Sequence, residues 1–153
     1  NGKCPEEIID RLLDIVPSCQ IVRSHSLLQS SRIMNIFRSR NLKYDSNDYI
    51  PAAQVSRVDP WEMENGLIKV PYIFSDELDC FKAGSPLTEI LSREGLKVFN
   101  FHPIHVFLNT ENLKRYENTR EFHGTPKNLI KERYEGYGTR SKLIEILKEL
   151  SNL

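Results

Sequence analysis

The sequence contains no run of eighteen apolar residues, and its first ten residues, NGKCPEEIID, lack the basic start and the apolar centre of a secretion signal. Cysteine is also scarce: Cys4, Cys19 and Cys80 are odd in number and show no C-x-x-C spacing. This usage argues against a disulfide framework and against a structural zinc site. We therefore expect a cytoplasmic protein with reduced thiols and no membrane partner.

The sequence also has no excess of positive or negative charge. The 21 basic and 21 acidic side chains cancel, so no net field attracts the protein to nucleic acid or to an anionic membrane. The motifs G-x-G-x-x-G, the P-loop, G-x-S-x-G and H-E-x-x-H do not occur, which removes most of the support for nucleotide binding and for α/β-hydrolase chemistry. The expected partner is therefore small or neutral, and it is not a nucleic acid.

Enough apolar material is present for one core, since 39% of the 153 residues are hydrophobic, and we expect a single domain over 1–153. Helical spacing of apolar residues predicts four helices, with Ser85 and Ser141 as N-caps of the last two, at 5–16, 30–41, 85–95 and 141–150. Apolar runs predict strands near 19–25, 66–76 and 96–102. The segment 44–61 is expected to be mostly loop with one or two short strands, and 107–140 to be a long loop. This alternation favours an α/β fold with a parallel sheet.

Polar residues follow each predicted strand at its carboxyl end. They are Arg23 and His25, then Ser75 and Asp76, then His102 and His105. Binding and catalytic sites of barrels and of open α/β sheets are built at this edge. The sequence therefore predicts a site there.

Alternatives remain open for the residues at the first two strand ends. His25 is either a metal ligand or a loop histidine that caps the next helix. Arg23 either pairs with a carboxylate or, with Tyr72, binds a substrate. The carboxylate of Asp76 suits metal binding, polarisation of a histidine or contact with sugar hydroxyls, although acidic residues in loops are more often just solvated.

The third strand end carries HPIH. Because Pro103 separates His102 from His105, we do not expect the two histidines to be paired ligands on one helix. The proline favours an extended His102, which suits a general acid or a ligand better than a solvated histidine, and places His105 on a loop. The alternative is a histidine satisfied by the backbone at the core edge. The segment 115–141 suits a carbohydrate site or an ordinary surface loop.

Three segments together resemble a known family. VRSHSL, VPYIFSDE and LKVFNFHPIHVFLNT are similar to the polysaccharide deacetylase (NodB-homology) family, in particular its divergent branch associated with bacterial surface polysaccharide clusters. The resemblance extends from about Pro5 to Leu150. It implies a distorted (β/α) barrel with fewer than eight strands, which removes acetyl groups from N-acetylated sugars using a divalent metal, with zinc as the first expectation.

The resemblance also implies roles for single residues. His25, in SHSLLQSS, matches a metal-binding histidine, and His102, or with less support His105, matches the general acid. Asp76 matches an acidic strand-end residue that orients catalytic groups. The implied reaction is hydrolytic: a metal-activated water attacks the acetyl carbonyl, a carboxylate takes its proton, and the histidine protonates the leaving amine.

The chain departs from the family pattern at two places. A strand-end pair of aspartates should precede His25 and is not in the chain, and Gln29 stands where a second metal-binding histidine is usual. Glutamine is a poor zinc ligand, so either Ser30 or an additional histidine completes the site, or the metal is absent. We expect an incomplete barrel, the C-terminal part of a larger polypeptide, completed by an N-terminal segment or by another copy.

Three functions follow from these patterns. The leading one is a metal-dependent sugar N-deacetylase with a carbohydrate substrate. The second is a catalytically silent carbohydrate-binding domain on the same scaffold. The third is an α/β interaction domain whose histidines are structural.

Overall fold

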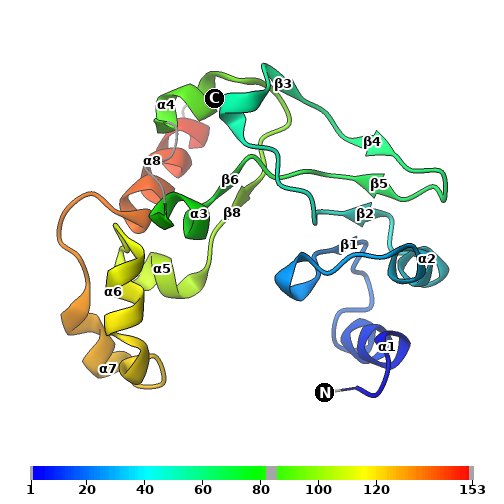
Figure 1. The fold of residues 1–153 in the computed structure, drawn as a ribbon, viewed down its shortest axis with the longest axis horizontal. Coiled ribbons are helices and arrows are strands. Elements are labelled where there is room, and N and C mark those ends of the chain that lie inside the picture. Colours follow the sequence, from blue (N-terminus) through cyan, green and yellow to red (C-terminus); the bar gives the residue numbers. More distant parts are fainter. Residues whose placement is uncertain (1, 82–85, 152–153) are drawn as a thin grey trace.

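The computed structural model describes residues 2–81 and 86–151, which form a mixed α/β structure (Figure 1). Its helices are α1 (Pro5–Ile15), α2 (Ser31–Ser39), α3 (Asp76–Phe81), α4 (Leu87–Ser92), α5 (Pro103–Leu108), α6 (Leu113–Asn118), α7 (Pro126–Leu129) and α8 (Thr139–Ser151). Short 3₁₀ turns lie at His25–Leu27, Ala52–Gln54, Arg120–Phe122 and Ile130–Glu132. Within the described ranges, no helix combines the length and the apolar character that crossing a membrane requires.

The strands are short and mostly parallel. They are β1 (Ile21–Val22), β2 (Tyr44–Asp45), β3 (Arg57–Val58), β4 (Trp61–Glu62), β5 (Ile68–Lys69), β6 (Phe74–Ser75), β7 (Glu94–Gly95) and β8 (Phe99–Asn100). They form one sheet of order β1-β2-β5-β4 and two pairs, β3-β7 and β6-β8. Of these pairings only β4 with β5 is antiparallel.

One extended segment, 68–75, joins the main sheet to the β6-β8 pair. Its first residues, β5, pair with β2, and Tyr72 then bridges to Tyr49. Next, the Ile73 amide donates to the Val98 carbonyl, and β6 pairs with β8. The parallel strands therefore follow one another in chain order, and their carboxyl ends lie along one edge. Among the described strands the sheet stays open and no barrel closes.

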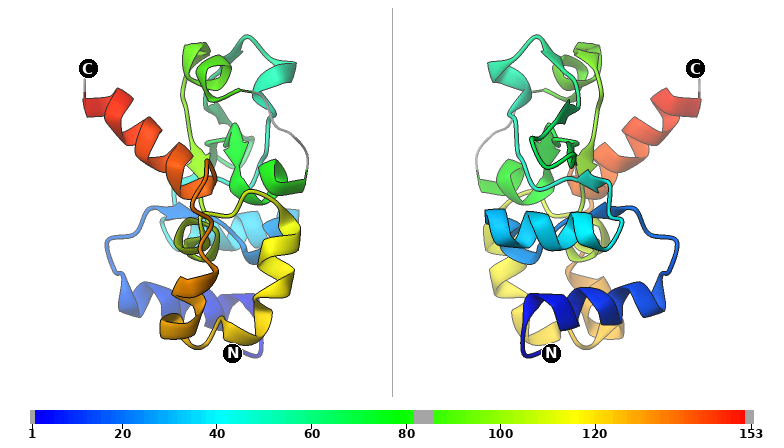
Figure 2. Two further views of the ribbon diagram at one scale, coloured as in Figure 1. Left: turned by 90° about the vertical axis from the view of Figure 1, so that its left-hand side faces the viewer. Right: turned by 90° about the vertical axis from the view of Figure 1, so that its right-hand side faces the viewer.

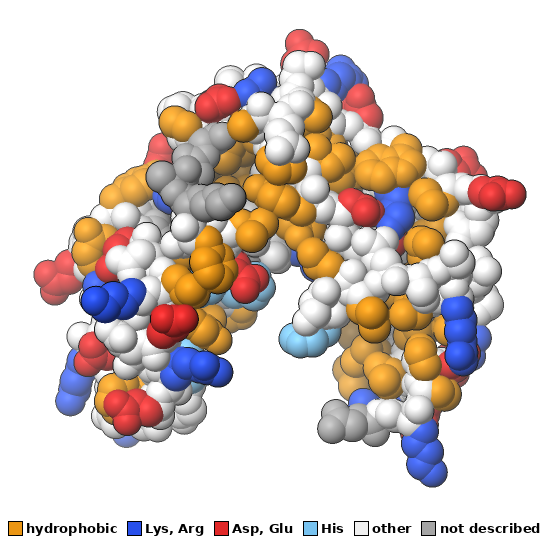
Figure 3. Space-filling view, in the orientation of Figure 1, with side chains coloured by type: hydrophobic (Ala, Val, Ile, Leu, Met, Phe, Trp, Pro, Cys, Tyr) orange, Lys and Arg blue, Asp and Glu red, His pale blue; other side chains and the backbone are white. Residues whose placement is uncertain are grey.

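Two arms extend from this strand region (Figure 1). One contains α1 and α2 beside β1, β2 and β5, and the other contains α5 to α8. Figure 3 shows a hollow between the arms, with histidine side chains on both of its sides. Helix α8 packs on α5 and extends away from the rest of the molecule (Figure 2).

Apolar clusters hold each part of the sheet. In the first arm Phe37, Leu42 and Leu67 are buried between α1, α2 and the main sheet. A second cluster, which includes Ile73 and Phe74, packs β6 against α4 and β3. Leu67 is completely buried, and burying such a side chain contributes about 1.5–3 kcal/mol.

The helix predictions for 5–16, 30–41 and 141–150 are confirmed as α1, α2 and α8, but α8 begins at Thr139, so Ser141, its expected N-cap, lies within the helix. The predicted helix at 85–95 is shorter, because residues 94–95 leave it to pair with β3 as β7. Its expected cap, Ser85, lies outside the described residues.

Two loop predictions are wrong. Pro103 begins helix α5 instead of preventing a helix. The first N–H groups of a helix have no acceptor within the helix, so a proline there removes no hydrogen bond. His105 is therefore helical. The expected long loop after it contains α6 and α7, where Asn112 caps α6 by accepting from the Arg115 amide and Pro126 starts α7.

Candidate active site at the carboxyl ends of the strands

A carboxylate and a histidine form the centre of the site. Asp76 is fully buried, and its Oδ1 lies 2.6 Å from Nδ1 of His102. Its other oxygen accepts the backbone N–H of His102 at 2.7 Å, and the Glu77 amide donates to Oδ1. The His102 side chain is 41% exposed. The buried carboxylate thus binds the Nδ1 edge of the imidazole and leaves Nε2 as the nitrogen available to a reactant.

Strand register explains why these two residues meet. In the parallel pair of β6 and β8, Ser75 lies opposite Asn100. Asp76 directly follows Ser75, and His102 comes two residues after Asn100, so both side chains emerge at the same carboxyl edge. The prediction that Asp76 and His102 lie together at this edge agrees with the geometry; their chemical roles stay predictions.

His105, the alternative general acid, has a different environment. It lies on α5 and is 4% exposed, with Nδ1 at 3.2 Å from the Thr110 hydroxyl. Its ring meets the His102 ring edge-on, with 5.8 Å between centroids. Burial lowers the pKa of His105, so this imidazole is neutral near pH 7. His102 is therefore the histidine that contacts Asp76, and His105 packs against the His102 ring without contacting that carboxylate through a hydrogen bond.

Arg23 and Tyr72, the predicted substrate-binding residues, contact each other. The Arg23 guanidinium lies 4.5 Å from the centroid of the Tyr72 ring, which is almost completely buried. Arg23 also donates to the backbone and hydroxyl oxygens of Ser46 and to the side-chain oxygen of Asn100. Burial lowers the pKa of Arg23 but leaves it a cation at any ordinary pH. Three of its five N–H donors are thus engaged within the protein, and a direct contact with substrate stays a prediction.

Arg23 also connects two parts of the strand edge. On one side it binds Ser46, which directly follows β2. On the other it binds Asn100, whose amide is 3.4 Å from the Ser75 hydroxyl beside Asp76. This arrangement orients the β8 end, and with it the chain leading to His102.

A second charged cluster lies at the same edge and was missed in the sequence. Asp45 and Lys69 are register partners of β2 and β5, both are buried, and their charged groups lie 2.7 Å apart. The Lys69 ammonium also lies 2.9 Å from Asp48 and donates to the Gln29 side-chain oxygen at 2.5 Å. Burial lowers the pKa of Lys69, but hydrogen bonds and charges of Asp45 and Asp48 outweigh it and raise that pKa.

One signal could have revealed this cluster. Lys69 interrupts the apolar run LIKVPYIF, where a charge inside a buried strand requires a partner. Asp45 ends a strand of two residues and Asp48 follows it, within a segment predicted to be mostly loop with one or two short strands. The polar composition of 44–61 hid the strand end.

The predicted metal ligand His25 is exposed, and its turn is tied to the edge by a hydrogen bond from the Ser24 amide to Asn47. Over residues 2–81 and 86–151, no three His, Cys, Asp or Glu side chains gather as a metal site would require. The Gln29 oxygen, at the second ligand position implied by the resemblance, faces the ammonium of Lys69. A cationic neighbour and an amide oxygen do not suit zinc, so the described donors do not fit this ion.

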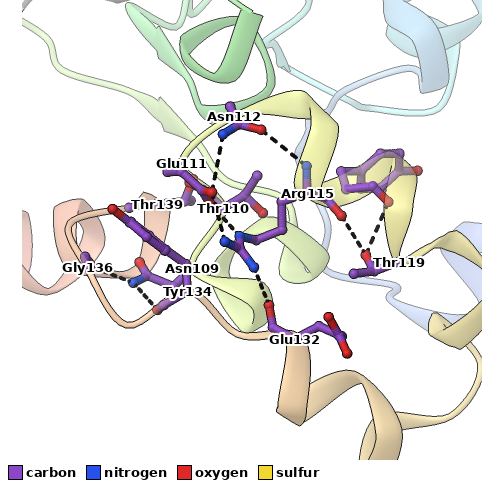
Figure 4. A network of polar contacts seen from close by, with 12 residues as sticks. Asn109, Thr110, Glu111, Asn112, Arg115, Thr119, Glu132, Tyr134, Gly136 and Thr139 are labelled. Atoms are coloured by element: carbon purple, nitrogen blue, oxygen red, sulfur yellow. Dashed lines mark hydrogen bonds and ion pairs between the residues drawn. The ribbon is translucent and has the colours of Figure 1, made fainter.

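The segment 115–141 is pinned to the end of α5 by polar contacts (Figure 4). The Asn109 amide donates to the carbonyls of Tyr134 and Gly136, both at 2.8 Å, and Arg115 donates to the Glu132 carbonyl. Gly138 passes so close that an added Cβ would lie 2.0 Å from the Asn109 carbonyl oxygen. The backbone here is held in one path, and carbohydrate binding by it stays a prediction.

Comparisons with known proteins identify a family and a similar fold. Residues 1–120 match the WbmS-like polysaccharide deacetylase family. The crystal structure of a proposed polysaccharide deacetylase involved in O-antigen biosynthesis, WbmS from Bordetella bronchiseptica, superposes with a TM-score of 0.88 at 37% identity. The match covers 97% of this chain and 63% of that one, so the chain spans less than two thirds of its length. No curated protein matches. The chain belongs to the WbmS-like polysaccharide deacetylase family.

Proposed function

We propose that this chain contributes the acid–base part of a site that removes acetyl groups from a carbohydrate by hydrolysis. The observation that carries the proposal is the Asp76–His102 pair, in which a fully buried carboxylate holds a partly exposed imidazole at 2.6 Å. Membership of a polysaccharide deacetylase family supports the reaction class. The similar solved structure, attributed to O-antigen biosynthesis, supports a bacterial surface polysaccharide or its precursor as substrate.

In the proposed reaction water adds to the acetyl carbonyl carbon, and a base takes the proton that the water loses. The bond from that carbon to the sugar nitrogen then breaks, giving acetate and a free amine. Protonated His102 delivers the proton that the departing nitrogen needs. Asp76 stabilises the charged imidazole and fixes its orientation through Nδ1, so that Nε2 is the donor.

The fold proposed with this function is a distorted (β/α) barrel, of which this chain forms a part. Its support is the chain-order arrangement of parallel strands β1, β2, β5–β6 and β8 along one edge. The site lies at the carboxyl ends, as in barrel enzymes. Because the chain spans 63% of the length of the matched structure, the activity of a whole protein is part of the proposal.

Acetate release from a panel of N-acetylated saccharides tests the function. His102→Ala should lower kcat/KM by about 10²–10⁴-fold, the usual contribution of a general acid. Asp76→Asn should lower it as well, while retaining substrate binding. His123→Gln is the control, since that histidine bonds to Thr119 and reaches His102 only through the rings of Tyr116 and His105. Undiminished acetate release by His102→Ala would show that the assigned role is wrong.

A second candidate is a silent carbohydrate-binding domain. The specific observation in its favour is the Gln29 oxygen facing Lys69, at the place of an implied metal ligand. This candidate predicts saccharide binding in a calorimetric or NMR titration without acetate release, and equal affinity in wild type and His102→Ala. The deacetylase proposal predicts both binding and release.

A further inference from the structure

The ammonium of Lys69 is surrounded by oxygens from three separate parts of the chain. Asp45 Oδ2, at the end of β2, lies at 2.7 Å, Asp48 Oδ2 from the following loop at 2.9 Å, and Gln29 Oε1 from the segment before α2 at 2.5 Å. The ammonium donates hydrogen bonds to Asp45 and Gln29, and Asp48 Oδ2 lies beside it as an ion-pair partner. The Lys69 side chain is 4% exposed and that of Asp45 is fully buried, so water does not compete within this ion pair, whereas Asp48 is 31% exposed and Gln29 lies at the surface.

This arrangement has the form of a small coordination site with its cation already in place. Carboxylate and amide oxygens are the donors that hard divalent cations take from proteins, and a Lys amine tethered to β5 fills the centre instead. The remaining oxygen of Asp45 accepts from the Asn47 backbone and side-chain amides at 3.0 and 2.5 Å. Both Asp45 oxygens are thus engaged, and a second cation would meet the ammonium charge first.

We propose that Lys69 takes the place of a divalent metal ion in this cluster, binding the ends of β2 and β5 and the Gln29 segment together through its own charge. Gln29 fits this role because its neutral amide oxygen accepts from an ammonium, whereas a histidine nitrogen at the same place would favour a metal. The inference concerns the resident cation, so it holds whether or not the chain removes acetyl groups.

Metal content and thermal unfolding, measured together, test the proposal. Wild-type protein purified without chelator should contain far less than equimolar Zn²⁺, Mn²⁺ or Ca²⁺, and its Tm should not respond to EDTA or to millimolar Mn²⁺. Lys69→Ala should lower Tm by about 10 °C, since the buried carboxylate of Asp45 and the partly exposed carboxylate of Asp48 lose their cation. Millimolar Mn²⁺ or Ca²⁺ should then restore part of that loss in Lys69→Ala alone. Lys43→Ala, at an exposed lysine on the same segment as β2, is the matched control and should behave as wild type.

Each outcome decides the question. Equimolar metal in the wild type that is lost in Asp45→Asn overturns the proposal, because the carboxylate would then hold a metal despite Lys69. Lys69→Ala that gains no stability from any of these ions also overturns it. If Lys69→Ala does not fold, Lys69→Gln provides the same comparison, because it removes the cation and keeps a hydrogen-bonding amide.

Discussion

Two buried carboxylates at the same sheet edge have different partners. Asp45 faces the ammonium of Lys69, which is itself buried, whereas Asp76 faces the imidazole of His102, which reaches solvent. In the first pair both charges are enclosed, and the interaction stabilises the junction of β2 and β5. In the second the buried partner holds an exposed one in a defined orientation. One edge thus combines an enclosed ion pair with a pair whose imidazole reaches solvent, where the proposed proton transfer would take place.

Asp45→Asn should have the largest effect on stability. It leaves the buried ammonium of Lys69 with Asp48 as its remaining charged partner, and breaking a buried ion pair costs about 3–5 kcal/mol. Urea unfolding measures the loss. Asp59→Asn is the control, because Asp59 pairs with Arg57 on the surface, where such pairs contribute roughly 0–1 kcal/mol. Equal effects of the two variants would show that the buried cluster does not stabilise the fold.

Asp76→Asn should destabilise less, by about 1–3 kcal/mol, the penalty for disturbing buried hydrogen bonds without stranding a buried cation. The substitution removes the negative charge that faces His102. In the wild type one oxygen of Asp76 contacts the His102 ring and the other accepts its backbone N–H, whereas asparagine has a single acceptor oxygen. Urea unfolding gives this value, and acetate release gives the accompanying loss of activity. A larger loss of stability than for Asp45→Asn would reverse the comparison between the two pairs.

Arg23→Lys tests the connection between the two pairs. Lysine keeps the positive charge but cannot reach Ser46 and Asn100 together in the planar geometry of the guanidinium. We expect a loss of about 1–2 kcal/mol and a change in the His102 imidazole signals in an NMR spectrum. Arg32→Lys, at an exposed arginine paired with Glu6, is the control. Unchanged His102 signals would mean that Arg23 does not orient the β8 end.

The smallest expected effect is a pH dependence from His105. Because burial lowers its pKa below the usual 6.5, the unfolded state binds a proton more readily than the folded state. This contribution to stability is complete above about pH 6.5 and decreases as the pH falls through that value toward the folded pKa. Urea unfolding at pH 7.5 and pH 5.5 should show a loss of roughly 1 kcal/mol or less that His105→Gln removes. An equal pH dependence in the variant would exclude His105 as its source.

The sequence located part of the site because strand-end position is a strong signal. Asp76 and His102 each follow a clear apolar run, and parallel pairing of those runs necessarily brings their ends together. The sequence did not reveal Asp45, because a strand of two residues inside a polar segment has no readable period. It also misplaced His105, because Pro103 is compatible both with the end of a strand and with the first turn of a helix.

Local pattern therefore determined the α/β class, the helices α1, α2 and α8, and the family to which the chain belongs. Tertiary structure decided which of the two neighbouring histidines contacts Asp76 and which cation Asp45 faces. It also decided that Arg23 connects the end of β2 with the end of β8. The physical reason is that these contacts join residues from 23 to 77 positions apart, brought within hydrogen-bond distance by sheet register. Composition and periodicity report the local environment of a residue, whereas the identity of a distant partner depends on how the strands are aligned.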